Sequence, residues 1–279
     1  MERVDPRFLT HALADLPRGV VVVTGTNGKT TTTKMLVAIL REHGLTVFTN
    51  PTGSNFTRGV ISSMLAEIPL SGRLKADIAV LELDEAHALK FAAAVRPRHS
   101  LLLNVARDQL DRFAEIDHTA RLLANLAEQT TTSVVLNLDD SYVSRIADRV
   151  REGVTVSYFG VDPSIADRLP ELQEADVRFE DAFTPPRPSA ADGLLKPHDE
   201  RSFEVRFGHT ERVGPMVLKQ RGLAAMINAT AATSTAKVVL AKDFRDIDVV
   251  AALERVEPPF GRGEVIDADG QPLELVLVK

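Results

Sequence analysis

Short apolar runs rich in β-branched residues recur along the first half of the chain. The first is Gly-Val-Val-Val-Val-Thr at residues 19–24, a continuous run without polar alternation. Continuous runs of this kind are typical of parallel strands whose two faces are both covered. We expect five such strands, at residues 19–24, 76–83, 100–105, 133–138 and 154–159.

The segments between these runs have apolar residues spaced three and four apart, which is the period of an amphipathic helix. The predicted helices lie at residues 30–43, 85–95, 117–129 and 139–150. Regular alternation of strands and helices predicts βαβ units. The predicted fold class is therefore α/β, with a doubly wound, mostly parallel sheet.

The pattern changes at residues 162–201, which contain six prolines and many charges but no sustained period. This composition predicts an irregular surface insertion. Regular patterning resumes with a predicted hairpin of residues 202–207 and 212–219, followed by an Ala-rich helix at residues 222–240. The hairpin would give the sheet a small antiparallel addition.

A last strand-like segment, residues 272–279, ends the sequence with nothing after it to cover its faces or its edge. Natural domains rarely leave a strand in that position. We therefore expect one domain over residues 1–260 and the start of a further domain at residues 261–279. The chain is expected to be a fragment of a longer protein.

Composition narrows the possible functions. The 279 residues carry 33 Lys and Arg against 39 Asp and Glu, a net charge of −6, so we expect no nucleic-acid partner. The apolar runs are too short to cross a bilayer and the N-terminus lacks a signal-peptide core, so we expect a cytoplasmic, non-transmembrane protein. With no cysteine, disulfides, thiolate nucleophiles and Cys-type zinc sites are excluded, and no zinc is expected.

Residues 24–30, Thr-Gly-Thr-Asn-Gly-Lys-Thr, lie between the first predicted strand and the first predicted helix. A loop in this place presents backbone N–H groups and a helix N-terminus to phosphates. Lys29 would reach the β- and γ-phosphates of ATP, and the Thr30 hydroxyl would ligate Mg²⁺. The standard pattern has a further glycine two residues before Gly25, where this chain has valine. The competing interpretation is a turn with a solvated lysine, which the flanking strand and Thr-rich helix argue against.

Carboxylates follow the second long strand. Glu82 lies at its carboxyl end, the edge at which open α/β sheets bind ligands, and an acid there suits Mg²⁺ binding. The alternative is a strand-end glutamate that simply emerges into solvent, and the sequence does not decide between the two. Asp84 and Glu85 are interpreted as a helix cap and a first-turn acid.

Two later strand ends are also dense in polar residues. Residues 104–113 follow an apolar strand and have the character of a ligand loop, in which Asp108 and Gln109 are candidates. The alternative is a charged loop whose Asp and Arg side chains pair with each other. Asp140, in Asn137-Leu138-Asp139-Asp140, is a further candidate, with capping of the next helix as the competing interpretation.

In order and spacing, these motifs resemble the Mur ligase superfamily. The shared features are Thr-Gly-Thr-Asn-Gly-Lys-Thr, an acid on the next long strand, Asn-x-x-x-Asp after the following strand, Asn-x-Asp-Asp, and Gly-Arg-x-Glu at residues 261–264. The resemblance spans nearly the whole chain. It implies the P-loop fold of the central ATP-binding domain of a Mur ligase.

Within the superfamily, residues 50–55, 82–86 and 107–112 are similar to the MurT family, the synthetase subunits of lipid II isoglutaminyl synthase. Peptide-adding Mur ligases usually have Asp-His where this chain has Asp108-Gln109, and the glutamine favours MurT. Two features depart from that family. Many MurT proteins carry a four-cysteine zinc ribbon, and MurT proteins continue into a C-terminal domain that is expected to be missing here.

The resemblance implies a set of site residues. The ATP-binding residues would be Gly25, Thr26, Asn27, Gly28, Lys29, Thr30, Asn228 and Arg262. Thr30 and Glu82 would hold Mg²⁺. Possible contributors from the substrate or nucleotide loops are Asn55, Asp108, Gln109 and Asp140. Asn228 carries over unevenly, because family members often have a second asparagine at the position of Ala225.

The activity implied is amide formation during peptidoglycan synthesis. The α-carboxylate of D-glutamate in the lipid II stem peptide would attack the γ-phosphate of ATP, and ammonia would capture the resulting acyl phosphate. The ammonia would come from a GatD-type glutamine amidotransferase partner. The enzyme would work at the inner face of the cell membrane.

Two alternatives stay open. The first is a Mur or folylpolyglutamate synthase-like ligase that adds an amino acid, against which Asp108-Gln109 argues modestly. The second is an ATP-binding fragment or interaction subunit without turnover. Because the C-terminal domain has no counterpart here, the chain by itself is expected to be incomplete for catalysis.

Overall fold

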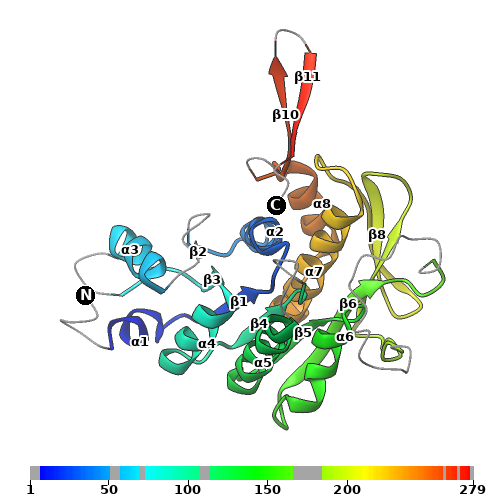
Figure 1. The fold of residues 1–279 in the computed structure, drawn as a ribbon. Coiled ribbons are helices and arrows are strands. Elements are labelled where there is room, and N and C mark those ends of the chain that lie inside the picture. Colours follow the sequence, from blue (N-terminus) through cyan, green and yellow to red (C-terminus); the bar gives the residue numbers. More distant parts are fainter. Residues whose placement is uncertain are drawn as a thin grey trace.

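The computed structural model describes residues 7–50, 57–68, 73–106, 113–165, 184–259, 262–268 and 271–276. Its centre is a nine-stranded sheet (Figure 1). In spatial order the strands are β2 (Val47–Thr49), β3 (Ile78–Glu82), β1 (Val20–Thr24), β4 (His99–Leu102), β5 (Ser133–Asn137), β6 (Thr155–Val161), β7 (Gly193–Pro197), β8 (Ser202–Phe207) and β9 (Glu211–Val217). The first seven run parallel, and β8 and β9 are antiparallel.

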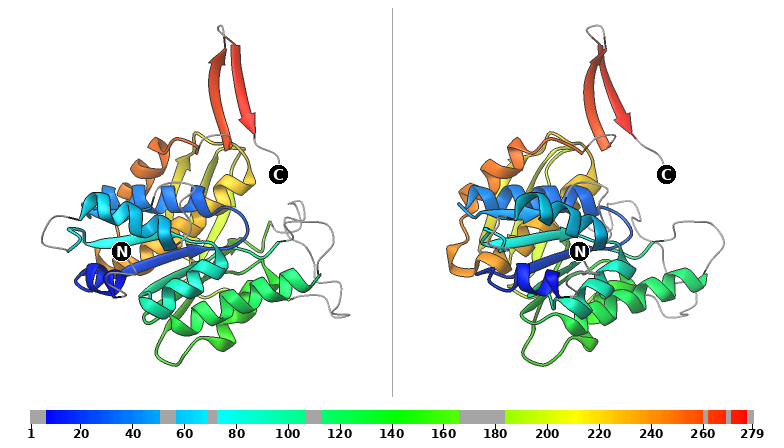
Figure 2. Two further views of the ribbon diagram at one scale, coloured as in Figure 1. Left: turned by 60° about the vertical axis from the view of Figure 1, so that its left-hand side comes forward. Right: turned by 90° about the vertical axis from the view of Figure 1, so that its left-hand side faces the viewer.

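Helices cover both faces of the sheet (Figure 2). One face carries α2 (Lys29–Glu42), α7 (Leu223–Leu240) and α8 (Asp246–Arg255). The other carries α1 (Phe8–Leu13), α3 (Thr57–Glu67), α4 (Glu85–Ala94), α5 (Phe113–Gln129) and α6 (Ser141–Ser144). Short 3₁₀ turns, η1 (Arg145–Arg149) and η3 (Ala241–Asp243), follow α6 and α7. The predicted fold class, a doubly wound and mostly parallel α/β sheet, is confirmed.

The alternation of side chains along β1 shows why the continuous apolar run forms a central strand. Val21 and Val23 pack into the core beneath α2 and α7, whereas Val20 and Val22 pack into the core beneath α4 and α5. Both faces are therefore apolar. Complete burial of each such side chain contributes about 1.5–3 kcal/mol.

Helix α2 forms in spite of its local sequence. Its first five residues include Thr30, Thr31, Thr32 and Thr33, and β-branched residues lower intrinsic helix propensity. All four are buried, and the following turns place Met35, Leu36, Ile39 and Leu40 in the core. Tertiary packing therefore fixes the helix, as is common in proteins.

Among the described residues, one stretch, Leu223–Asp243, is long and apolar enough to cross a membrane, and 67% of its apolar window is buried inside the protein. In this structure α7 lies against the sheet between α2 and the last strands. Its apolar composition serves the core.

The predicted insertion at residues 162–201 is wrong in part, because it contains strand β7. This strand pairs in parallel with β6 and antiparallel with β8, joining the two parts of the sheet. Gly193 is required at its start, since a Cβ there would lie 2.0 Å from the Ser234 hydroxyl of α7. The five residues of β7 begin with glycine and end with proline, so their sequence shows no alternation that would predict a strand. Residues 166–183 of the predicted insertion lie outside the described residues.

The single helix predicted at residues 139–150 is also wrong. Asp140 is an N-cap, so α6 begins at Ser141, and after four residues the chain continues as the 3₁₀ turn η1. Serine competes for backbone hydrogen bonds and weakens a helix at Ser141 and Ser144.

Besides β7, six described elements have no counterpart among the predicted ones, namely α1, α3, α8, η3, β2 and β10. Strand β2 and helix α1 are too short to show a period. Helix α8 is different, because Val249, Ala252 and Leu253 are buried at helical spacing and the sequence contains that signal.

The last strands described, β10 (Arg262–Ala268) and β11 (Gln271–Val276), form a separate antiparallel hairpin. Figure 1 shows it projecting from the end of the sheet where α8 lies. Strand β11 corresponds to the strand predicted at residues 272–279. The division into domains at residue 261 stays a prediction.

Candidate functional site

The topology brings three loops together at the carboxyl edge of the sheet. Strand β1 lies between β3 and β4, and the chain leaves β1 toward one face through α2 and leaves β3 toward the other face through α4. Such a switch point leaves a crevice beyond the strand ends, which is where open α/β sheets bind ligands. The sheet register places Val23 opposite Glu82 and Thr24 opposite Leu102.

The loop between β1 and α2 depends on its two glycines. Gly28 has φ of +83° and Gly25 has φ of +134°, conformations that favour glycine. A Cβ on Gly28 would lie 2.4 Å from Oδ1 of Asn228, and one on Gly25 would lie 2.9 Å from the backbone nitrogen of Asn104. The loop therefore turns tightly into the N-terminus of α2.

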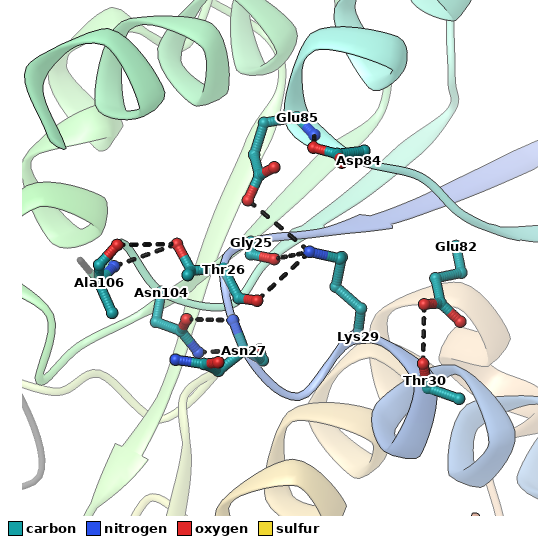
Figure 3. A network of polar contacts seen from close by, with 10 residues as sticks. All are labelled: Gly25, Thr26, Asn27, Lys29, Thr30, Glu82, Asp84, Glu85, Asn104 and Ala106. Carbon is teal, nitrogen blue, oxygen red and sulfur yellow. Dashed lines mark hydrogen bonds and ion pairs between the residues drawn. The ribbon is translucent and has the colours of Figure 1, made fainter. Parts of the chain in front are cut away.

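Asn104, at the end of β4, holds the loop from the side (Figure 3). Its Oδ1 accepts the Asn27 N–H at 2.8 Å and its Nδ2 donates to the Asn27 carbonyl at 3.0 Å. The Thr26 N–H donates to the Asn104 carbonyl, and the Thr26 hydroxyl accepts the Ala106 N–H at 3.1 Å. These bonds fix the loop to β4 and order its backbone.

Lys29 is the first residue of α2 and folds back over the loop. Its Nζ donates to the carbonyls of Gly25 at 2.5 Å and Thr26 at 3.3 Å, and lies 3.8 Å from Oε1 of Glu85. The ammonium group therefore lies above the loop at the helix N-terminus. This is the place from which a P-loop lysine reaches the β- and γ-phosphates.

Thr30 and Glu82 contact each other on the side of Lys29 that faces away from Glu85 (Figure 3). The Thr30 hydroxyl donates to Oε1 of Glu82 at 2.8 Å, and both side chains are buried. Asn50, at the end of β2, fixes the Glu82 backbone by accepting its N–H at 2.9 Å and donating to its carbonyl at 2.8 Å. The interpretation of Glu82 as a solvated strand-end residue is therefore wrong.

The Thr30 and Glu82 oxygens fit a magnesium ion by their chemistry. Mg²⁺ prefers oxygen ligands and usually takes one or two protein carboxylates together with phosphate and water oxygens. Among the residues that the structure describes, no group of three or more His, Cys, Asp or Glu side chains could hold a metal by itself. A cation here would therefore depend on the bound phosphates for its remaining ligands.

Asp84 and Glu85 follow β3 at the start of α4. Asp84 is the N-cap, and its Oδ1 accepts the Glu85 N–H at 2.7 Å, so the predicted cap is confirmed. Its side-chain hydrogen bond with Glu85 is the largest of the causes that lower the pKa of Asp84, and Lys29 adds to them. Burial, followed by the hydrogen bond to Asp84, raises the pKa of Glu85 to about 7, and Lys29 opposes this shift.

The other candidate residues differ in where the structure places them. Asn228, near the start of α7, places its side chain beside Gly28. Asp140 is buried and accepts the N–H groups of Val105, Tyr142 and Val143, so its capping interpretation is confirmed. The backbone of Arg262 starts β10, while its side chain lies outside the described part. Asn55, Asp108 and Gln109 lie outside the described residues.

Comparison with known proteins gives the family. A model described as the Mur ligase middle domain matches residues 23–185, more than half of the chain. The chain belongs to the Mur ligase middle-domain family. Members of this family are ATP-dependent ligases, and the loop of residues 24–30 with Glu82 lies in the matched region.

Curated relatives of this Mur ligase domain include two functional classes. The MurT subunit of lipid II isoglutaminyl synthase from Streptococcus pneumoniae is 38% identical over 146 residues, covering 51% of this chain and 31% of that protein. The MurT subunit from Staphylococcus aureus strain COL is 32% identical over 159 residues, covering 57% and 35%. A UDP-N-acetylmuramoylalanine–D-glutamate ligase from Geobacter metallireducens is 36% identical over 135 residues, covering 47% and 27%.

Solved structures agree with the Mur ligase fold. The pseudomurein peptide ligase type C from Methanothermus fervidus has a TM-score of 0.67 at 23% identity, over 93% of this chain and 53% of that one. The MurF ligase from Thermotoga maritima, solved in complex with ADP, has a TM-score of 0.65 at 19% identity, over 98% and 56%. The chain spans about a third of the curated relatives and about half of these structures.

Three residues that form contacts within the site were not predicted from the sequence to be site residues. Asn104 and Asn50 are both at strand ends, and their position there was the available signal. Glu85 was interpreted only as a first-turn acid, although its side chain faces Lys29. That contact joins two helices on opposite faces of the sheet, so no local pattern could show it.

Proposed function

We propose that this chain is the nucleotide-binding and phosphate-activating part of a ligase that amidates a carboxylate of lipid II. ATP is the phosphoryl donor, and the acceptor is the α-carboxylate of D-glutamate in the stem peptide. The arrangement of Lys29, Thr30 and Glu82 around the N-terminus of α2 is the observation that carries this proposal. The MurT relatives support amidation as the specific reaction.

The phosphates occupy the loop of residues 25–30, where backbone N–H groups and the α2 N-terminus neutralise charge. Lys29 contacts the β- and γ-phosphates, and Asn228 and Arg262 contribute to the nucleotide site. Thr30 and Glu82 would hold Mg²⁺, which would supply neutralisation of the negative charge on the phosphate oxygens. Phosphoryl transfer is mainly positioning and electrostatic stabilisation, so these groups suffice for this half of the reaction.

The reaction proceeds in two displacements. A carboxylate oxygen of the acceptor attacks the γ-phosphorus, the bond to the β-phosphate oxygen breaks, and ADP leaves. The nitrogen of ammonia then attacks the acyl carbon, loses a proton and expels inorganic phosphate. The products are the amide, ADP and phosphate.

A second subunit supplies the ammonia. The relatives named MurT are subunits of a glutamine-hydrolysing synthase, which supports a GatD-like glutamine amidotransferase as the partner here. A lipid-linked acceptor places the work at the cytoplasmic face of the membrane. The chain spans about a third of the length of these relatives.

Addition of an amino acid is the second candidate. The D-glutamate ligase of Geobacter metallireducens matches this chain at 36% identity, close to the value for the MurT relatives. Both reactions pass through an acyl phosphate, so the P-loop site serves either. They differ in the nucleophile, which is ammonia in one and an amino acid in the other.

Replacing Lys29 tests the nucleotide site. We expect Lys29→Ala to abolish measurable ATP binding in a calorimetric titration while leaving the circular dichroism spectrum unchanged. Lys34→Ala is the matched control, because Lys34 is an exposed lysine on the same helix. Unchanged affinity in the Lys29 variant would refute the assignment of the loop.

The nucleophile is tested with the chain, ATP and Mg²⁺, to which either lipid II with an ammonium salt or UDP-N-acetylmuramoylalanine with D-glutamate is added. Amidated lipid II in the mass spectrum with ammonium alone supports amidation. A product extended by one amino acid supports the second candidate. ATP binding without ADP release under every condition, also with a GatD-type partner and glutamine, identifies a nucleotide-binding fragment without turnover.

A further inference from the structure

The ammonium group of Lys29 is surrounded by three acceptors of two kinds. The carbonyls of Gly25 and Thr26 approach it from the loop, and the carboxylate of Glu85 approaches it from α4 (Figure 3). An ammonium group has three protons to donate. The two carbonyls accept two of them, so a phosphate oxygen that accepts the third would share the ammonium group with the nearby Glu85 carboxylate.

Glu85 differs from the two carbonyls because it carries charge. Its side chain is 13% exposed and that of Lys29 is 15% exposed, so solvent and salt screen the pair only weakly. The separation of 3.8 Å is an ion-pair distance and leaves the carboxylate free of a direct hydrogen bond to the lysine. A bound triphosphate would bring a second anion to the same cation.

The two acids beside the loop have separate partners. Glu82, at the end of β3, accepts the Thr30 hydroxyl, while Glu85 lies across the loop and faces Lys29 (Figure 3). A first-turn acid is usually explained by the helix N-terminus alone. The helix N-terminus does not require the side chain to be buried against a lysine of another helix. The position of Glu85 therefore needs a further explanation.

We propose that Glu85 is a positioning residue for Lys29. The Glu85 carboxylate competes with the terminal phosphate for the lysine ammonium group and thereby sets the affinity for nucleotide. The inference rests on the proposed function, because it requires a nucleotide in the loop. Removing the charge of Glu85 while keeping its shape frees Lys29 for the phosphate. It also removes repulsion between two anions in a weakly screened site.

The titration of Glu85 provides a readout that a merely structural residue would lack. Burial raises the pKa of Glu85 to about 7, so the carboxylate gains its charge between pH 6 and pH 8. The titratable groups around it are Lys29 from α2 together with Asp84 and His87 at the start of α4. Competition for Lys29 therefore strengthens as the pH rises through 7.

The test compares Mg·ATP binding by the parent chain and by Glu85→Gln at pH 6 and pH 8. We expect the variant to bind about three- to tenfold more tightly than the parent at pH 8 and within about twofold of it at pH 6. Because both proteins meet the same ligand, the titration of ATP itself cancels in this ratio. Glu152→Gln, at an exposed turn, is the matched control and should follow the parent at both pH values.

Equal or weaker binding by Glu85→Gln at pH 8 would overturn the inference, as would a gain of the same size at both pH values. A thermal unfolding curve for each variant verifies that both proteins are folded. If neither the parent nor the variant binds ATP, the proposed function fails instead. The two failures are therefore distinguishable.

Discussion

Gly28 and Gly44 have the same backbone angle, φ of +83°, in different surroundings. A Cβ at Gly44 would meet nothing within 4 Å, whereas a Cβ at Gly28 would lie 2.4 Å from Oδ1 of Asn228. An alanine in the left-handed region costs about 1–2 kcal/mol at either position. Comparison of the two positions therefore separates backbone strain from crowding in the nucleotide loop.

We expect Gly44→Ala to lower the free energy of unfolding by about 1–2 kcal/mol without changing ATP affinity. Gly28→Ala should lose at least as much stability and also weaken ATP binding about tenfold or more, because its loop must shift away from Asn228. Urea unfolding and calorimetric titration measure the two effects. Parent-like ATP affinity in Gly28→Ala would show that the loop tolerates the shift.

At the scale of elements, Asp139 connects the end of β5 to β6. Its Oδ2 accepts the Val161 N–H at 2.8 Å, and the side chain lies close to Gly160. Burial, opposed by the Val161 hydrogen bond and reinforced by the neighbouring Asp140, raises the pKa of Asp139 from 3.8 to about 6. The connection therefore contains a carboxylate that is costly to ionise.

The sign of the pH effect follows from this shift. Between about pH 4 and pH 6 the folded chain keeps the Asp139 proton that the unfolded chain has lost, so this group's contribution to stability falls as the pH rises. The loss amounts to about 3 kcal/mol at most and is complete above pH 6. We expect Asp139→Asn, which can still accept the Val161 N–H, to gain stability relative to the parent across that window. Urea unfolding at pH 4, 5, 6 and 7.5 measures the difference, and a constant difference would contradict the prediction.

The elements that could be predicted from the sequence are those with a strong local signal. Strand β1 is a continuous apolar run. The loop after it is recognisable from its glycine, lysine and threonine residues between a strand and a helix. Strand β7 could not be predicted, because Gly193 is selected by the Ser234 hydroxyl of a helix some forty residues later. Among the site residues, Lys29 and Thr30 follow from a motif, whereas the contacts of Asn104 and Glu85 depend on the assembled sheet.

At the scale of the whole molecule, the candidate site draws on both layers of helices. Lys29 and Thr30 come from α2 on one face, Glu85 comes from α4 on the other, and Glu82 comes from the sheet between them. A ligand held by Lys29, Thr30 and Glu82 would join α2 to strand β3, whose side chains contribute to both hydrophobic cores. Nucleotide binding should therefore stabilise the cooperative unit as a whole and not only the loop.

Thermal unfolding tests this coupling. A ligand that binds only the folded state at about 100 times its Kd adds about 2.7 kcal/mol, which for a domain of this size raises the Tm by roughly 5–10 °C. We expect such a single, shifted transition for the parent with Mg·ATP and a smaller shift with ATP and a chelator. Glu82→Gln keeps an acceptor for Thr30 but loses the charge that holds the cation, so its shift should be the same with Mg²⁺ as with chelator. Identical magnesium dependence in Glu82→Gln and the parent would contradict the assignment of Glu82 to the metal site. An early unfolding transition that ATP does not shift would show that the two hydrophobic cores unfold independently.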